Sequence, residues 1–385
     1  MTPSPGRPIA EDQSTDKLST MAVFETAVSK AHTKVKECFF SADSGKDDSS
    51  IVGPYWVSTT MLPGYATLDL QHLREIQTLV ASIRCYAKDR SRRRPLNFLL
   101  HAEPGSGKSH FVECLAQKLS DERVKDVAFN MTSMREIEDL AAPIDRVRDL
   151  KVADRLPLLF LDEFDSDPRN FARLLPVLWD GKLDVGGRLL QTGKMVVILA
   201  GSSSRIAQIS AAAKSLEDKT TIEDGKLIDL LSRINGGEIS IPSLDENSPD
   251  RDRRVDKVCL AAALLLQRFG KSLRRVPWAL LRFIVDTKFR HGSRSIATLL
   301  DMIPSMDADT SDLTLDKLHL PLGDVNALRS SSLVYHLAKT EAEVIVNSWG
   351  NLEKSLALVA IAEEETFVSR LIEHLRNEPF VKQAL

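Results

Sequence analysis

The chain has 385 residues, enough for two or three domains with a substantial core. Its formal net charge is -3, which argues against a protein that binds nucleic acid over its whole surface. The four cysteines form no CxxC pair, so we expect no zinc site and no disulfide framework, and a reducing, cytoplasmic location. The first 20 residues do not resemble a signal peptide, and the longest apolar run, from Val258, is too short to span a bilayer, so we expect no membrane contact.

The N-terminal region is polar. Residues 1–50 are predicted to be mostly disordered, with one short amphipathic helix whose apolar residues recur between Phe24 and Val35. A second helix is predicted further on, from the apolar stripe Leu70, Leu73, Ile76, Leu79, Val80 and Ile83.

From Leu96 onward, short apolar runs alternate with helical patterns. The runs occupy 96–100, 127–129, 156–161 and 195–200, with a weaker one at 237–241. This alternation predicts an α/β domain over 51–244, in which helices cover both faces of a parallel sheet. Residues 245–305 are predicted to form a small helical domain, and 306–385 a mostly helical C-terminal region.

The first predicted strand leads directly into HAEPGSGKSH (101–110), which matches the phosphate-loop pattern GxxxxGK[ST] with Ala102 at the first position. A helical pattern follows, so backbone N–H groups and the helix N-terminus would face a bound phosphate. Lys108 would contact the β- and γ-phosphates of a nucleotide, and Ser109 would ligate Mg²⁺. The alternative is an ordinary strand–turn–helix junction. The residues predicted to bind the nucleotide are Glu103, Pro104, Gly105, Ser106, Gly107, Lys108, Ser109 and His110.

Two acids follow the most apolar predicted strand, in LLFLDEFD. Beside a phosphate loop, Asp162 would hold Mg²⁺ through water, and Glu163 would act as general base toward the attacking water. The alternative is that both are solvated turn residues, and this is the interpretation we adopt for Asp165 and Asp167.

These residues resemble the AAA+ ATPase superfamily of P-loop proteins, over about 51–305. The resemblance implies that 245–305 is a lid domain and that the cofactors are ATP and Mg²⁺. It also implies a homo-oligomer, expected to be a hexameric ring or open ring.

Three further positions fit that family's order of motifs, and they are predicted as catalytic together with Lys108 and Glu163. Ser203 matches sensor 1, with Ser202 as a close alternative. Arg233 in DLLSRI matches the arginine finger that acts on a neighbouring subunit, with Arg205 as a rival. Arg294 in HGSRS matches sensor 2. Each also has a simpler interpretation: a turn cap for the serine, a surface ion pair for the finger and a helix-start residue for the sensor 2 arginine.

More narrowly, stretches such as NMTSMREIEDL and KFRHGSRSI resemble a set of bacterial AAA+ proteins, some of which carry a ryanodine-receptor-like domain. We recognise no such additional domain in this sequence.

The sequence also bears on which nucleotide is bound and on what its hydrolysis drives. The stretch after the second predicted strand, NMTSMREIEDLAAPIDRV, contains no aromatic residue and no glycine, which disfavours threading of polypeptide through a ring. The GTP-reading NKxD motif is absent, which favours ATP. We therefore expect an ATPase that remodels or regulates an unidentified protein partner.

Two alternatives remain open. The first is a slow, nucleotide-gated signalling or scaffold protein in a defence or stress system. The second is a DNA-associated loader, because basic clusters at 88–94 and 268–275 could contact phosphates. Neither cluster contains interleaved aromatic residues, so we interpret both as solvated or subunit-interface charge.

Overall fold

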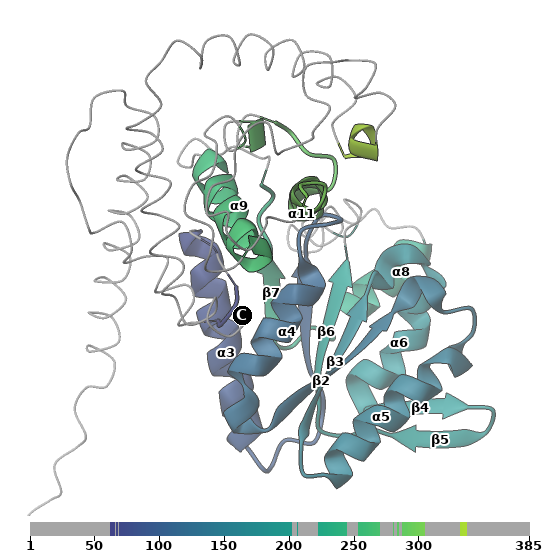
Figure 1. Cartoon of the computed structure of the whole chain (residues 1–385). Helices are drawn as coiled ribbons and strands as arrows, with labels where there is room; N and C mark the ends of the chain where they lie inside the picture. The colour runs from purple at the N-terminus through teal and green to yellow at the C-terminus, as the bar shows by residue number, and fades with distance from the viewer. Residues whose placement is uncertain are drawn as a thin grey trace, which may run out of the picture.

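The computed structural model describes residues 62–65, 67, 69–201, 206, 222–244, 253–269, 280, 283–284, 287–304 and 332–336 (Figure 1). The predicted N-terminal segment 1–50 lies outside these residues, as does most of 306–385. The three serines and the arginine at 202–205 also lie outside them.

The predicted parallel sheet is confirmed. Five strands pair in the order β2-β3-β6-β1-β7, and all neighbours run parallel. The strands are β1 (Leu96–His101), β2 (Val124–Asn130), β3 (Leu156–Asp162), β6 (Val196–Gly201) and β7 (Gly237–Ser240). Each was predicted to within a few residues. The apolar runs of β1, β3 and β6 mark strands that are buried on both faces, whereas β2 and β7 are partly exposed and gave weaker runs.

Helices cover both faces of this sheet (Figure 1). Alternate residues of β1 face opposite ways, so Leu100 packs in one core cluster and Leu99 in the other. Residues of α3 and α4 line the first cluster, whereas residues of α5, α6 and α8 line the second. These helices are α3 (Leu70–Lys88), α4 (Lys108–Lys118), α5 (Ala141–Val152), α6 (Arg169–Asp180) and α8 (Ile222–Leu231). Short 3-10 turns are η2 (Ser120–Glu122), η3 (Met131–Ser133), η4 (Ile137–Leu140), η5 (Phe164–Ser166) and η8 (Ser332–Tyr335).

The sequence did not reveal a small antiparallel hairpin of β4 (Lys182–Val185) and β5 (Arg188–Gln191). Its strands have four residues each and fully bury only Leu183 and Leu190, so the apolar pattern is weak. The signal that could have revealed it is Gly186-Gly187, whose φ angles of 58° and 82° fit a tight hairpin turn.

Two further helices, α9 (Arg253–Phe269) and α11 (Gly292–Asp301), pack together beyond the carboxyl edge of the sheet (Figure 1). Arg268 Nη1 lies 2.5 Å from Asp301 Oδ1 and joins the two helices. Arg253 Nη1 lies 3.2 Å from Asp69 Oδ2 at the start of α3, and both side chains are largely buried. The start of α9 is therefore held to the start of α3 by an ion pair shielded from water. No helix within the described residues has the length and apolar character needed to cross a membrane.

Candidate nucleotide site

The loop between β1 and α4 has the backbone of an anion cradle. Gly105 and Gly107 have φ angles of 82° and 90°, a region that residues with a Cβ rarely occupy. Gly107 is the N-cap of α4, and no side chain in the described part of the chain caps it. The first backbone N–H groups of α4, at the positive end of the helix, are therefore available to donate to a ligand.

The side chain of Lys108 is buried, and its ammonium group has no hydrogen-bond acceptor among the described residues. Lys108 is only 6% exposed. The nearest carboxylate oxygen, Asp162 Oδ1, is 3.9 Å away, at the limit of an ion pair. Ser106 Oγ is also buried without a hydrogen bond in the same part of the chain. Buried donors of this kind are costly unless a partner is supplied, and a nucleotide phosphate supplies one. The loop therefore fits a phosphate group.

Register explains why the acids meet the loop. Leu100 of β1 and Asp162 of β3 both pair with Ala200 of the intervening β6, so the two strands end at the same level. The carboxyl ends of parallel strands share one edge, which brings Asp162 to Lys108. A sequence can predict this only by assuming the strand order.

The electrostatics of Asp162 suit a cation ligand. Burial raises the pKa of this carboxyl group, with Glu163 adding to the rise, while Lys108 and Arg294 oppose it. The neighbouring cations thus only partly compensate for the desolvation of Asp162. A divalent cation at this position would favour the ionised form of Asp162, and carboxylate oxygens are ligands that suit Mg²⁺.

Glu163 has a strained backbone. Its φ angle is 54°, in the left-handed region, and its N–H donates to Asp162 Oδ1 at 3.0 Å. The N–H of Ser166 donates to the Glu163 carbonyl oxygen at 3.0 Å, which holds the turn. Strain of this kind in a non-glycine residue costs roughly 1–3 kcal/mol and is concentrated at functional sites.

The helix α11 contacts the loop directly. The N–H of Arg294 and the Oγ of Ser293 both donate to the carbonyl oxygen of Gly105, at 3.1 and 2.6 Å. The approach is so close that a Cβ on Gly105 would lie 2.3 Å from the carbonyl oxygen of His291. The structure thus places the backbone of Arg294 against the loop, and the charge of its side chain lowers the pKa of Asp162. The catalytic role of Arg294 stays a prediction.

The other predicted loop residues surround this centre. Pro104 and Ser109 are exposed, and Ser109 is the second residue of α4. Glu103 accepts a hydrogen bond from Ser243 Oγ at 2.9 Å. His110 Nε2 lies 2.9 Å from the carbonyl oxygen of Gly64. His110 therefore connects α4 to the segment that precedes α3.

Arg233 does not lie with the residues around the phosphate loop. It follows α8 and lies beside the amino end of β1, where its carbonyl oxygen accepts from Asn97 Nδ2 at 2.9 Å. At about 3.3 Å per strand residue, β1 alone separates that end from the loop by roughly 15–20 Å. Arg233 therefore cannot reach the loop of its own chain. Ser203, with its alternative Ser202, and the rival finger Arg205 lie outside the described residues.

The sequence analysis missed two sets of residues that matter here. His291 and Ser293 contact the loop, although only Arg294 was singled out in HGSRS. Arg94 and Trp179 lie beside Arg233 at the amino edge of the sheet. The first set lies next to the predicted Arg294 and could have been inferred from it. The second joins distant segments: Arg94 belongs to the basic stretch 88–94, which was interpreted as solvated or subunit-interface charge, but nothing in the sequence linked it to Trp179 or Arg233.

No family model and no curated protein matches the chain. Among solved structures, it is similar to the S. cerevisiae Hsp104-ADP complex, with 16% identity and a TM-score of 0.42, over 73% of this chain and 50% of that one. It is also similar to NtrX from Brucella abortus in complex with ATP, with 16% identity and a TM-score of 0.45, over 87% and 67% of the two chains. A third is the Aeropyrum pernix ORC2 protein in its ADPNP-ADP complexes, with 15% identity and a TM-score of 0.42, over 63% of each chain.

The chain thus spans about half the length of the first of these proteins and about two thirds of the others. At this degree of similarity, the assignment of function depends on the chain's own residues.

Proposed function

We propose that this chain is an AAA+-type ATPase that binds ATP with Mg²⁺, hydrolyses it, and couples the nucleotide state to the position of its helical domain. One observation carries the proposal. The carbonyl oxygen of Gly105, within the phosphate loop, accepts hydrogen bonds from Ser293 and Arg294 of α11, beside a buried Lys108 that lacks a hydrogen bond among the described residues.

The residues of the site have complementary chemical roles. Lys108 and the N–H groups of the loop bind the β- and γ-phosphates, and Ser109 and Asp162 hold Mg²⁺. Bound Mg²⁺ supplies neutralisation of phosphate charge. Glu163 accepts a proton from the attacking water, and its strained turn lies directly after Asp162. Ser203 is proposed to orient that water.

The contact between the loop and α11 is the proposed conformational element. Arg294 would bind the γ-phosphate, and its own backbone N–H is already bonded to the loop. Loss of the γ-phosphate removes one partner of Arg294 and so shifts the equilibrium between docked and released α11.

An oligomer is part of the proposal because Arg233 lies too far from its own loop to act there. In a ring, expected to be a hexamer, Arg233 of one subunit would stabilise transition-state charge on the nucleotide of the next. The partner on which such an assembly acts is proposed to be a protein. The narrower resemblance to the ryanodine-receptor-associated set remains a prediction.

The test is nucleotide binding and turnover by the full chain. Lys108→Ala should abolish binding of a fluorescent ATP analogue, whereas Lys182→Ala, which changes an exposed lysine on β4, should leave binding unchanged. Glu163→Gln should keep binding and reduce turnover by about 10²–10⁴-fold, the usual contribution of a general base. Wild-type affinity in Lys108→Ala would refute the site.

The same proteins separate the two remaining alternatives. A wild-type protein that binds ATP tightly but turns over slowly, with no stimulation by an unfolded polypeptide, would favour the signalling or scaffold alternative. Tight binding of an oligonucleotide at low salt, where even non-specific phosphate contacts are strong, would favour the DNA loader. Capture of partners by Glu163→Gln in ATP would then identify what the assembly acts on.

A further inference from the structure

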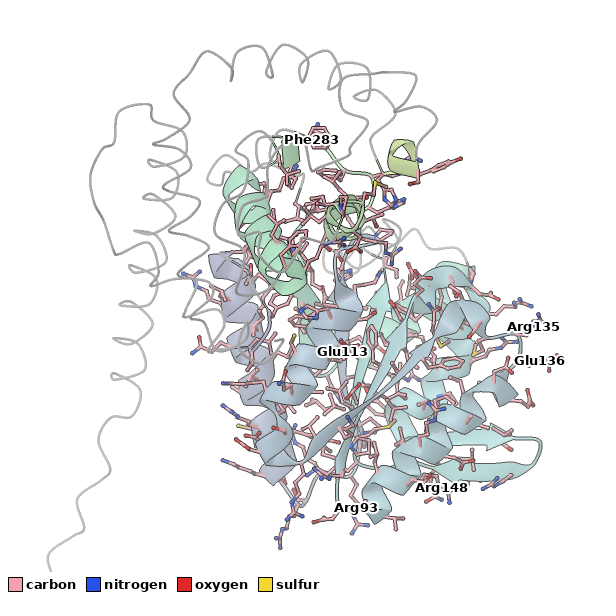
Figure 2. The ribbon with its side chains drawn as sticks, viewed as in Figure 1. Arg93, Glu113, Arg135, Glu136, Arg148 and Phe283 are labelled. Carbon is pink, nitrogen blue, oxygen red and sulfur yellow. The ribbon has the colours of Figure 1, made fainter. Side chains whose placement is uncertain are left out.

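A cluster of two arginines and a tryptophan lies at the amino edge of the sheet, at the end opposite to the phosphate loop. The guanidinium carbon of Arg94 lies over the indole ring of Trp179, 4.3 Å from its centroid, and that of Arg233 lies 6.0 Å from the same centroid. Trp179 remains 41% exposed. Figure 2 labels the adjacent Arg93 at this edge, far from the helical domain. We call these three residues the amino-edge cluster.

A buried amide holds the three segments together. Asn97 of β1 is fully buried, and its Nδ2 donates to the carbonyl oxygen of Leu178 at 2.8 Å and to that of Arg233 at 2.9 Å. One side chain thus fixes both the residue before Trp179 and the backbone of Arg233. The N–H of Asn97 donates to Asn235 Oδ1 at 2.8 Å, which ties the turn after Arg233 to β1 as well.

The third segment is fixed in the same way. The hydroxyl group of Tyr86 donates to the carbonyl oxygen of Arg94 at 2.7 Å, and Asn235 Nδ2 donates to that of Pro95 at 3.1 Å. The backbones that carry Arg94, Trp179 and Arg233 are therefore held by buried or half-buried hydrogen bonds. Functional side chains are typically carried by backbone segments that hydrogen bonds hold in place in this way.

The cluster keeps unused capacity to bind an anion. Arg94 is exposed, and no carboxylate among the described residues lies within 4.0 Å of it. Arg233 Nη1 donates to the carbonyl oxygen of Asp229 at 2.5 Å and lies 3.8 Å from Asp229 Oδ1, at the limit of an ion pair. The Asp229 side chain is half exposed, and the buried Nε of Arg233 has no hydrogen bond within the described chain. A guanidinium stacked on an aromatic ring keeps its in-plane N–H donors, which match the spacing of phosphate oxygens. Two cations on one ring repel each other, and a bound anion would relieve that repulsion.

The position of the cluster excludes the nucleotide of its own chain, because β1 lies between them. We propose that the amino-edge cluster acts in trans: Arg94 and Arg233 together contact the phosphates of a nucleotide bound by a second copy of this chain, and Trp179 positions both guanidinium groups. This inference rests on the proposed ATPase function and adds Arg94 and Trp179 to it. The arginines form and break no bond; they stabilise the charge that develops on the transferred phosphoryl group.

Nucleic acid is the competing occupant, since Arg94 belongs to the basic stretch 88–94. Single strands bind by stacking bases on open aromatic faces. Here Trp179 is the aromatic ring of the cluster, and the guanidinium of Arg94 already lies over it. The geometry therefore favours phosphate contacts by a preformed arginine pair over base stacking.

Subunit mixing tests the action in trans. Arg94→Ala should lower kcat by about tenfold or more, below the 10³–10⁵-fold range of a sole arginine finger, and leave the affinity for the fluorescent ATP analogue unchanged. Arg93→Ala, the exposed neighbouring arginine, is the matched control and should retain wild-type kcat. Mixing Arg94→Ala with Lys108→Ala should restore turnover, because the second protein supplies Arg94 to an intact loop of the first.

Trp179 is tested as a positioning residue by a double-mutant cycle. Trp179→Ala should lower kcat by about three- to thirtyfold, the range of a cation–π contact, with unchanged analogue affinity. Adding Trp179→Ala to Arg94→Ala should cost less than the product of the single effects, because both changes act through the same guanidinium. Thermal unfolding of each variant checks that the fold is intact.

Each failure has a distinct signature. Absence of nucleotide binding or turnover in the wild-type protein would refute the proposed function itself. A wild-type ATPase in which Arg94→Ala behaves like Arg93→Ala, or in which mixing restores nothing, would overturn the action in trans and leave the proposed function standing. The inference would also be overturned if Arg94→Ala lost affinity for a labelled single-stranded oligonucleotide and kept full turnover.

Discussion

The contact between Gly105 and α11 offers the sharpest test of the proposed coupling. Gly105→Ala would place a Cβ 2.3 Å from the carbonyl oxygen of His291, a separation at which backbone must move. Gly187 in the β4–β5 turn has the same φ angle, 82°, but no atom of the described residues lies within 4 Å of where its Cβ would stand. The two substitutions share the conformational strain, so their difference isolates the contact with α11.

The expected loss of stability in each variant can be estimated from the backbone strain and from the hydrogen bonds that are lost. An alanine forced into the left-handed region costs about 1–2 kcal/mol, and Gly187→Ala should lose about that much stability. Gly105→Ala should in addition lose the bonds from Ser293 Oγ and Arg294 N–H to the Gly105 carbonyl oxygen. At about 0.5–1.5 kcal/mol each, the two bonds together contribute about 1–3 kcal/mol to the docking of α11.

The assay is hydrogen exchange at the start of α11. The Arg294 N–H is shared with the carbonyl oxygen of His291, also at 3.1 Å, so part of its protection is retained when the Gly105 bond is lost. Because 1.4 kcal/mol corresponds to a factor of ten, the Arg294 amide should exchange faster in Gly105→Ala than in the wild-type protein, by up to about 150-fold. Gly187→Ala should leave that amide unchanged. Equal exchange at Arg294 in both variants, together with equal affinity for ATP, would refute the reasoning that this contact couples the loop to the helical domain.

Three further predictions concern stability. Asp69 caps α3 through the N–H of His72 and pairs with Arg253, so in equilibrium denaturation Asp69→Asn should lose only the ion pair, whereas Asp69→Ala should lose about 1 kcal/mol more; identical losses would contradict this. Tyr86→Phe should cost about 1–3 kcal/mol of unfolding free energy, because it removes the buried hydroxyl group that bonds the chain before β1, and an unchanged unfolding midpoint would contradict that role. Burial, with the charges of His291 and Arg290, lowers the pKa of His336 below 6.5; the neutral form is therefore favoured in the fold, and this contribution to stability is lost as the pH falls through 6.5. Thermal unfolding at a series of pH values should show a loss on acidification that His336→Asn reduces, and an equal loss in that variant would exclude His336 as the cause.

The local pattern of the chain was enough to predict the sheet strands and to single out the residues around Lys108 as a candidate site. An apolar strand, two glycines, a lysine and a helix are adjacent in sequence, so the pattern around Lys108 can be recognised within one short stretch of chain. The acids at Asp162 and Glu163 follow another apolar strand, and parallel strands bring such ends to one edge. The loop itself is local, whereas its meeting with the two acids requires β1 and β3 to flank β6, a strand order that had to be assumed.

The β4–β5 hairpin after α6 could not be predicted from apolar runs. Its strands are short and bury few side chains, and their pairing depends on a glycine turn rather than on an apolar run. The same holds for the strained φ angle of Glu163, because a non-glycine residue in that region reflects constraints from the surrounding fold.

Consecutive residues thus specify a phosphate loop and its acids on a parallel sheet, because each of these elements is encoded within a short stretch of chain. How distant segments meet at either end of that sheet depends on the folded molecule. Ser293 reaches the loop from 188 positions away, and Asn97 satisfies its amide with carbonyl groups 81 and 136 positions away. Periodicity reports that a side chain is buried, but the partner that satisfies a buried polar group is chosen by the packing of the whole fold.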